Sequence, residues 1–162
     1  MLPTLRSARL VLRAMEDTDA AALFDIYGDP LVMQYTDEPP FPDLETVALM
    51  LASVRRLLAE GRSLEWAVAL PDGEVIGTCG LHGFNRPLRT AEVGCLLRRS
   101  AWGRGHMAIA IGMLTSFARD VLQLQRLTAD VAPDNERAQR LFNRLGYTPD
   151  ESGMLGRSID GR

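Results

Sequence analysis

The sequence contains few of the residues that build metal centres or covalent cross-links. Its 162 residues include two cysteines, Cys79 and Cys95, and two histidines, His82 and His106. Structural zinc sites need four closely spaced Cys or His ligands, and disulfide frameworks need several cysteine pairs. We therefore expect no metal site, no disulfide, and a cytoplasmic location in which both thiols stay reduced.

Long hydrophobic runs and an excess of basic charge are missing as well. No stretch approaches the roughly 18 uninterrupted apolar residues of a transmembrane helix, and the N-terminus lacks the apolar core of a signal peptide. The formal net charge is −3 at pH 7, whereas nucleic-acid-binding domains normally carry a basic face. The sequence therefore predicts neither a membrane protein nor a nucleic-acid binder.

The pattern of apolar residues predicts one α/β domain over residues 1–162, with helices packed on a mixed sheet. Apolar residues repeat every three to four positions in stretches that begin after Asp17, near Leu44, near Arg104 and after Asn135. Shorter runs typical of strands separate these helices, and Pro71-Asp72-Gly73 between two of the runs is a strong hairpin signal. The expected strands are 10–12, 65–70, 74–81, 91–98 and 126–132.

Residues 91–115 combine a strand, a short loop that contains Gly103 and Gly105, and an apolar helix. Glycines let a backbone approach a ligand closely, and the first turn of a helix leaves its N–H groups without partners. With the helix dipole, these groups form an anion site suited to a pyrophosphate. A tight strand-to-helix turn is an equally good interpretation of this feature alone. The Walker and dinucleotide-binding signatures are missing, which disfavours nucleoside triphosphates and dinucleotides.

Two segments in this order resemble the GNAT superfamily of N-acetyltransferases, and most closely its branch of ribosomal-protein N-terminal acetyltransferases. That family's acetyl-CoA pyrophosphate loop, Q/R-x-x-G-x-G/A, has its counterpart in Trp102-Gly103-Arg104-Gly105-His106-Met107. The family segment N-x-x-S/A-x(5)-K-x-G-F is matched by Asn135, Ala138, Arg144, Gly146 and Tyr147. The opening LRSARLVLR and the later AEVG are similar to the branch's first and fourth strands, so the resemblance covers residues 5–148.

The resemblance implies a central, mostly antiparallel sheet flanked by helices, with acetyl-CoA bound where the fourth and fifth strands splay apart. The backbone of the fourth strand would bind the pantetheine arm and the thioester carbonyl, and the loop amides would bind the pyrophosphate. Asn135 would contact the coenzyme arm, although a helix N-cap explains this residue equally well. The implied acetyl-CoA-binding residues are Leu96, Leu97, Arg98, Gly103, Arg104, Gly105, His106, Met107 and Asn135.

Three features depart from the family pattern. Trp102 and Met107 replace the commoner Q/R and G/A, and Phe142 stands where many members have a tyrosine that protonates the departing thiolate. The residues after Tyr147 are expected to be too few for the two strands that normally close the acceptor site. A shortened sheet edge of this kind favours pairing between chains, so a homodimer is one expectation.

An acceptor amine must be neutral to attack a thioester. Freeing an α-amine at pH 7 costs about 1 kcal/mol, against about 4.6 kcal/mol for a lysine side chain. We therefore expect an N-acetyltransferase that acts on a primary amine, foremost a protein or peptide N-terminus, by direct attack in a ternary complex. A polyamine or aminoglycoside acetyltransferase and a non-catalytic acyl-CoA-binding module are the competing functions.

Three acidic residues are candidates for the acceptor side. Glu92 lies in the predicted strand 91–98 on the same face as Leu96, and we expect it to act as the catalytic base through water. A solvated or arginine-paired carboxylate is the alternative. Asp37 and Glu38 lie in an acidic loop that would attract a cationic substrate, and a solvated loop is the alternative there.

Overall fold

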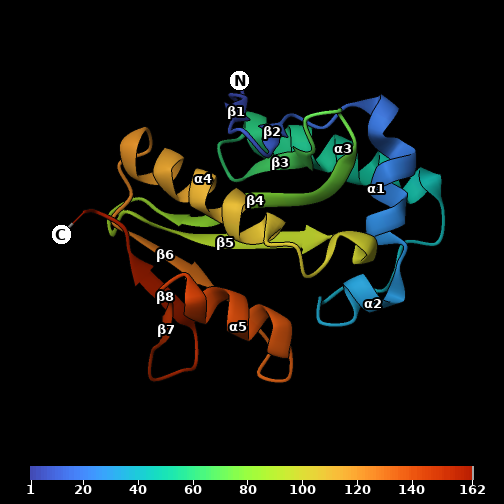
Figure 1. The fold of residues 1–162 in the computed structure, drawn as a ribbon. Coiled ribbons are helices and arrows are strands. Elements are labelled where there is room, and N and C mark those ends of the chain that lie inside the picture. The colour runs from blue at the N-terminus through green and yellow to red at the C-terminus, as the bar shows by residue number, and fades with distance from the viewer. Residues whose placement is uncertain (162) are drawn as a thin grey trace.

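The computed structural model describes residues 1–161 and contains one sheet of eight strands (Figure 1). Across the sheet the strands follow the order β1-β2-β3-β4-β5-β6-β8-β7. Neighbouring strands run antiparallel except β5 and β6, which are parallel. The strands are β1 Leu5–Arg6, β2 Val11–Arg13, β3 Leu64–Ala69, β4 Val75–Asn85, β5 Thr90–Leu97, β6 Arg126–Ala129, β7 Thr148–Pro149 and β8 Leu155–Ser158. This architecture confirms the predicted mixed, mostly antiparallel sheet.

Helices cover both faces of the sheet and bury a separate apolar core on each. The helices are α1 Ala20–Tyr27, α2 Pro30–Met33, α3 Leu44–Ala59, α4 His106–Asp120 and α5 Glu136–Arg144, with short 3-10 turns η1 Asp17–Asp19 and η2 Arg99–Ala101. On β3, Trp66 and Val68 join the core under α4 and α5, whereas Ala67 and Ala69 join the core under α1 and α3. The alternation follows from the two-residue period of a strand, which here is buried on both faces.

Side-chain caps fix the starts of three helices. Asp43 accepts a hydrogen bond from the Thr46 N–H at 2.9 Å before α3, and Asn135 accepts one from the Ala138 N–H at 3.3 Å before α5. Asp29 caps the four-residue α2, which the sequence did not predict because it is too short to show a helical period. Within the described residues, no helix combines the length and hydropathy needed to cross a bilayer.

Strands β5 and β6 pair over only part of their length. Thr90–Glu92 pairs in register with Arg126–Thr128, and beyond Glu92 the two strands separate. The second half of β5 therefore has β4 on one side and no strand on the other. This is the splay that the sequence resemblance implies, and α4 and α5 lie on either side of it in Figure 1.

The end of the chain corrects one expectation. The residues after Tyr147 do form two closing strands, because β7 and β8 pair with each other and β8 pairs antiparallel with β6 over four residues. The prediction of a tail too short for these strands was wrong because β7 spans only two residues and β8 only four. Strands of this length give no readable alternation in a sequence.

Candidate active site

The loop before α4 presents a row of unpaired amides. Gly103 and Gly105 have φ angles of +77° and +79°, a left-handed conformation that favours glycine. The Ile109 N–H is the first to bond backward in α4, to the Gly105 carbonyl at 3.3 Å. The amides of His106 and Met107 precede it and have no helical acceptor. Because these donors lie at the positive end of the helix dipole, the loop is suited to an anion.

The loop forms one wall of a cleft of about 520 Å³ between β5, α4 and α5. The cleft collects seven of the nine residues predicted to bind acetyl-CoA: Leu96, Leu97, Gly103, Gly105, His106, Met107 and Asn135. It also includes residues that sequence reasoning did not single out for binding: Leu31, Val32, Tyr35, Cys95, Trp102, Ala108, Arg137, Ala138, Arg140, Leu141 and Arg144. Arg98 and Arg104 do not line it.

Backbone pairing of β5 corrects the predicted role of Arg98. Its N–H donates to the Ile76 carbonyl at 2.7 Å, and its side chain bonds Glu74, so neither group faces the cleft. Since backbone groups alternate in direction along an antiparallel ladder, Leu96 also directs its N–H toward β4. The strand therefore offers the cleft the backbone of Cys95 and Leu97. The Leu97 carbonyl is already bonded, by the Trp102 indole N–H at 2.7 Å, which leaves its amide as a donor.

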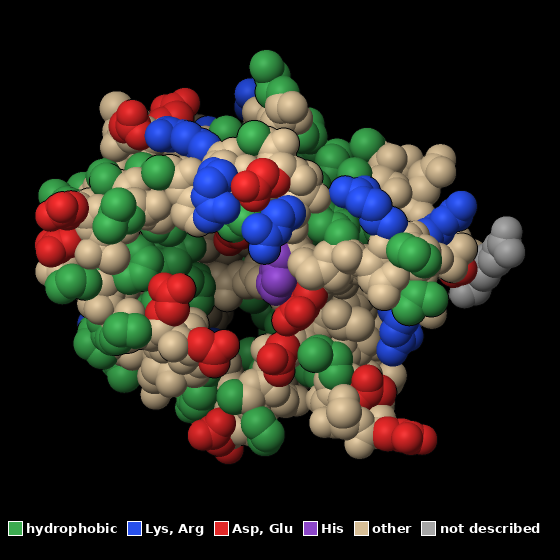
Figure 2. All heavy atoms as spheres, turned by 180° about the vertical axis from the view of Figure 1, so that it is seen from behind, with side chains coloured by type: hydrophobic (Ala, Val, Ile, Leu, Met, Phe, Trp, Pro, Cys, Tyr) green, Lys and Arg blue, Asp and Glu red, His purple; other side chains and the backbone are tan. Residues whose placement is uncertain are grey.

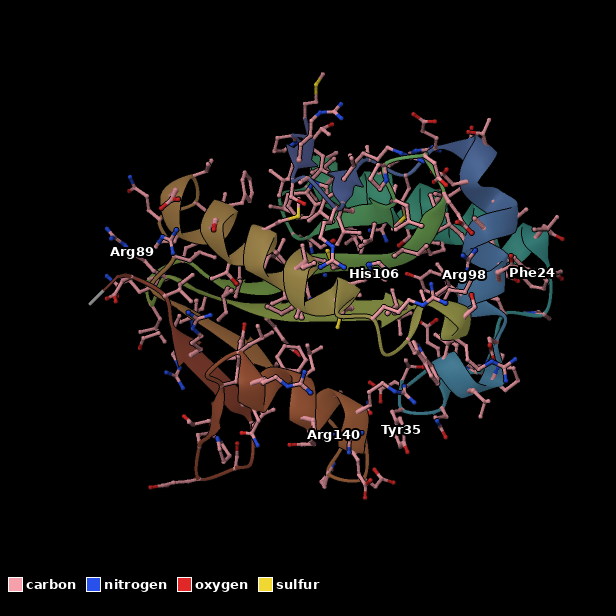
Figure 3. All side chains as sticks on the ribbon, in the orientation of Figure 1. Phe24, Tyr35, Arg89, Arg98, His106 and Arg140 are labelled. Atoms are coloured by element: carbon pink, nitrogen blue, oxygen red, sulfur yellow. The ribbon has the colours of Figure 1, made fainter. Side chains whose placement is uncertain are left out.

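Three arginines of α5 give the cleft a cationic wall. Arg137, Arg140 and Arg144 follow a three- and four-residue spacing, which places them along one side of the helix. The Arg137 guanidinium carbon lies 3.3 Å from the centroid of the Trp102 ring, so this arginine is held by a cation–π contact. In Figure 3, Arg140 and Tyr35 lie at the outer side of the gap between α5 and α2, and His106 lies nearer the sheet. Cations and unpaired amides together suit a ligand with several phosphates.

Two further groups in this region have little nucleophilic or acidic capacity. Burial raises the pKa of the Cys95 thiol to about 12, so Cys95 is a poor nucleophile although it lines the cleft. Phe142 is buried against Tyr147 with ring centroids 4.9 Å apart. The Tyr147 hydroxyl is buried without a hydrogen-bond partner among the described residues, and its pKa is raised to about 12, chiefly by burial. No tyrosine hydroxyl therefore stands at the Phe142 position.

The predicted base Glu92 lies outside the cleft. Its Oε1 is 3.6 Å from His82 Nε2, and the two side chains are 29% and 45% exposed. Strand alternation places Glu92 on the same face as Leu96, as predicted, and Leu96 packs into the core under α1 and α3. Glu92 is thus paired with a histidine on the face of the sheet opposite α4.

Asp37 and Glu38 also lie on that side, in the exposed loop between α2 and α3. The charge of Glu38 contributes to raising the pKa of Tyr27, after the larger effect of burial and the effect of Glu65. The acidic loop therefore lies near the C-terminal end of α1. Figure 2 shows this face of the molecule hollowed, with acidic side chains, a histidine and basic side chains at the rim.

Sequence reasoning missed Glu65, a carboxylate inside the apolar strand β3. It shares the sheet face of Ala67 and Ala69, is half-buried, and has no hydrogen bond or ion pair to the rest of residues 1–161. Burial raises its pKa to about 7. The register places Glu65 opposite Gly80, and its Oε2 lies 2.9 Å from the point that a Cβ on Gly80 would occupy. The only sequence signal for it was a lone charge within LEWAVA.

Comparison with known proteins identifies the family. The model of the acetyltransferase (GNAT) domain matches residues 9–148. The uncharacterised N-acetyltransferase p20 of Bacillus licheniformis is 33% identical over 167 residues, which cover 98% of this chain and 93% of that protein.

Two solved structures share the fold. A ribosomal L7/L12 alpha-N-protein acetyltransferase in complex with coenzyme A has a TM-score of 0.86 at 20% identity, covering 99% of this chain and 100% of that one. The spermidine N-acetyltransferase of Vibrio cholerae, in complex with CoA and spermine, has a TM-score of 0.81 at 18% identity, covering 94% and 97%. The chain belongs to the GNAT family and is an acetyl-CoA-dependent N-acetyltransferase.

Proposed function

We propose that this enzyme acetylates the N-terminal amine of a protein or peptide by direct attack in a ternary complex with acetyl-CoA. One observation carries the proposal. A cleft with unpaired amides on one wall and three arginines on the other reaches the open backbone of β5, and the opposite face of the molecule has a hollow with several acidic side chains at its rim. The first part suits a phosphorylated thioester, and the second suits a cationic amine.

In this proposal, different residues of the cleft contact different parts of acetyl-CoA. The amides of the loop from Gly103 to Met107 would hold the pyrophosphate, and the α5 arginines would hold the remaining phosphate charge. The free amides of Cys95 and Leu97 would bond the pantetheine arm and the thioester carbonyl. Asn135 uses its carbonyl oxygen to cap α5, which leaves its NH₂ group for the coenzyme arm. The two interpretations of Asn135 are therefore compatible.

The acceptor would enter from the hollowed face. Asp37, Glu38 and Glu92 give that side negative charge, which favours a cationic acceptor. An α-amine needs little help to lose its proton at pH 7, because its pKa is near 7.7–8.0. Amides of β5 that polarise the thioester carbonyl would supply the oxyanion stabilisation, and the ternary complex would supply proximity. No covalent acyl-enzyme is required, which agrees with the high pKa of Cys95.

A polyamine is the second candidate acceptor, and the same acidic side favours it. A polyamine carries several ammonium groups, so it would engage Asp37 and Glu38 together with Glu92, whereas a peptide N-terminus would engage one of them. One solved structure of this fold, the spermidine N-acetyltransferase of Vibrio cholerae, is a complex with CoA and spermine.

Thiol release from acetyl-CoA with a panel of amines tests the proposal. We expect release with short peptides that have a free N-terminus, little with N-blocked peptides that contain lysine, and a mass increase of one acetyl group on the peptide. All 18 basic residues of the chain are arginines, so acetylation of the enzyme's own lysines cannot contribute to the signal. Release with spermine and not with peptides would select the second candidate. Binding of acetyl-CoA without release for any amine would refute both.

A further inference from the structure

On the α1 and α3 face of the sheet, which Figure 2 shows hollowed, two glycines lie side by side. Gly80 of β4 and Gly94 of β5 are partners in the register, so two neighbouring strands lack side chains at the same level of the sheet. A Cβ on Gly80 would meet the Glu65 carboxylate, and a Cβ on Gly94 would lie 3.5 Å from the His82 ring. The tips of the Glu65 and His82 side chains therefore lie beside these two glycines.

We propose that the Glu65 carboxylate binds the acceptor ammonium in this hollow and removes its proton during acetyl transfer. The inference rests on the proposed function, because it needs an amine acceptor and a thioester held at β5. It names a catalytic residue that no sequence motif marks.

Three observations support this role, and the first is position. Strands of a sheet lie about 4.8 Å apart, so β3 and β5 are roughly 10 Å apart. The Glu65 carboxylate lies beside Gly80 of β4, and neither Gly80 nor its β5 partner Gly94 has a side chain that would separate it from β5. Leu96 lines the cleft and packs into the core on the hollow's face, so β5 is the common wall of the two sites.

The second observation is the absence of a partner. A buried carboxylate is normally paired, because an unpaired charge in protein is costly. Glu92, one row away on the same face, is paired with His82. Glu65 has no such partner among residues 1–161, although its surroundings are crowded enough to raise its pKa to about 7. A group that takes a proton from an amine near neutral pH benefits from a pKa in that range.

The third observation is that the neighbouring groups leave Glu65 free to act. Tyr27 Oη and Thr78 Oγ1 lie 3.1 Å apart and bond each other. The charge of Glu65 contributes to raising the pKa of Tyr27, so the phenol stays neutral. The other titratable groups around Glu65 are Glu38 of the loop after α2, His82 and Cys79 of β4, and Glu92 and Cys95 of β5. The two thiols have raised pKa values, and burial is the main cause of both shifts.

The step balances without a further reactant. The acceptor R–NH₃⁺ gives one proton to Glu65 Oε2, and the freed lone pair attacks the thioester carbonyl carbon. The C–N bond forms as the C–S bond breaks. The second amine proton leaves with the CoA thiol, and Glu65 then returns its proton to water. The products are the acetylated amine, CoA–SH and one proton.

The test compares Glu65→Gln with Glu92→Gln in steady-state kinetics from pH 5.5 to 9, with the best acceptor of the amine panel. We expect Glu65→Gln to lower kcat at least 100-fold and to remove the limb of the kcat profile near pH 7. Acetyl-CoA affinity, measured by calorimetry, should stay within twofold and would show that the variant is folded. We expect Glu92→Gln to raise KM for the amine and to keep that limb. Glu65→Asp should retain more activity than Glu65→Gln.

Three results would count against the inference, and they can be told apart. If Glu65→Gln keeps the wild-type kcat and pH profile, Glu65 is not the base, while the proposed function stands. If the wild-type enzyme releases no thiol with any amine of the panel, the proposed function fails and the inference fails with it. A Glu65→Gln protein that loses acetyl-CoA binding as well as activity would also count against a role confined to the amine.

Discussion

Replacing Gly105 with valine tests whether the loop amides bind the diphosphate. Gly105 has φ +79°, and a Cβ at this position would meet nothing within 4 Å. The substitution therefore causes no steric clash, and its cost is the left-handed backbone, about 1–2 kcal/mol. The strained loop would relax toward negative φ and turn its amides away from the ligand. Losing one hydrogen bond to a charged group costs roughly 1.5–3 kcal/mol, so acetyl-CoA should bind roughly 10- to 150-fold more weakly.

Gly73→Val is a matched control for this substitution. Gly73 also has a left-handed φ, +97°, with open space around its Cβ position, but it lies in the turn between β3 and β4 and does not line the cleft. Both variants should lose similar thermal stability, and only Gly105→Val should lose affinity in a calorimetric titration with acetyl-CoA. Equal affinities for the two variants would refute the reasoning and would make the loop a structural turn.

Other predictions address the arginines and the buried carboxylate. Arg137→Met should raise KM for acetyl-CoA about tenfold through loss of one charged contact and leave KM for acetyl-pantetheine unchanged; a similar rise for both would place Arg137 elsewhere. Arg98→Ala should leave the Kd for acetyl-CoA within twofold, because the Arg98 side chain bonds Glu74 and does not line the cleft; a larger loss in calorimetry would contradict that placement of the side chain. Because the folded pKa of Glu65 is raised above its ordinary 4.5 to about 7, the folded state holds that proton more tightly. Stability should therefore fall, by about 3 kcal/mol, as pH rises from 4.5 through 7. Urea titrations at pH 5 and 8 should show Glu65→Gln losing less stability over that range than the wild type, and parallel losses would contradict the shift.

The parts of the fold that the sequence predicts are those with a readable period. α3 and α4 each show an apolar stripe over 15 or 16 residues, and β3 and β4 flank a clear turn. α2, β7 and β8 have two to four residues each and are held by neighbours distant in sequence, as β8 is by β6. Their pairing energy comes from the tertiary structure, so no local pattern could reveal them.

The cofactor side of the site could be predicted further than the acceptor side. Gly103 and Gly105 mark the loop because only glycine adopts their φ angles without strain. The α5 arginines were not predicted as binding residues, although positions 137, 140 and 144 repeat at helical spacing in the sequence. The error at Arg98 had a different cause. Which strand residues turn their amides outward depends on register, and register is fixed here by the bond from Arg98 to Ile76.

Strand register also explains why the role of Glu65 could not be predicted from the sequence. β3 is buried on both faces, so LEWAVA reads as an almost continuous apolar run in which one carboxylate has no pattern to violate. Its proposed role becomes evident only in the folded sheet, where Gly80 and Gly94 are aligned beside it and put no side chain next to its carboxylate. A carboxylate in this position is stable only with a cation nearby or with a proton of its own. A bound acceptor ammonium would supply the cation, and its deprotonation would leave a proton on Glu65. The unpaired charge that destabilises the free protein would therefore favour both the binding and the deprotonation of the substrate.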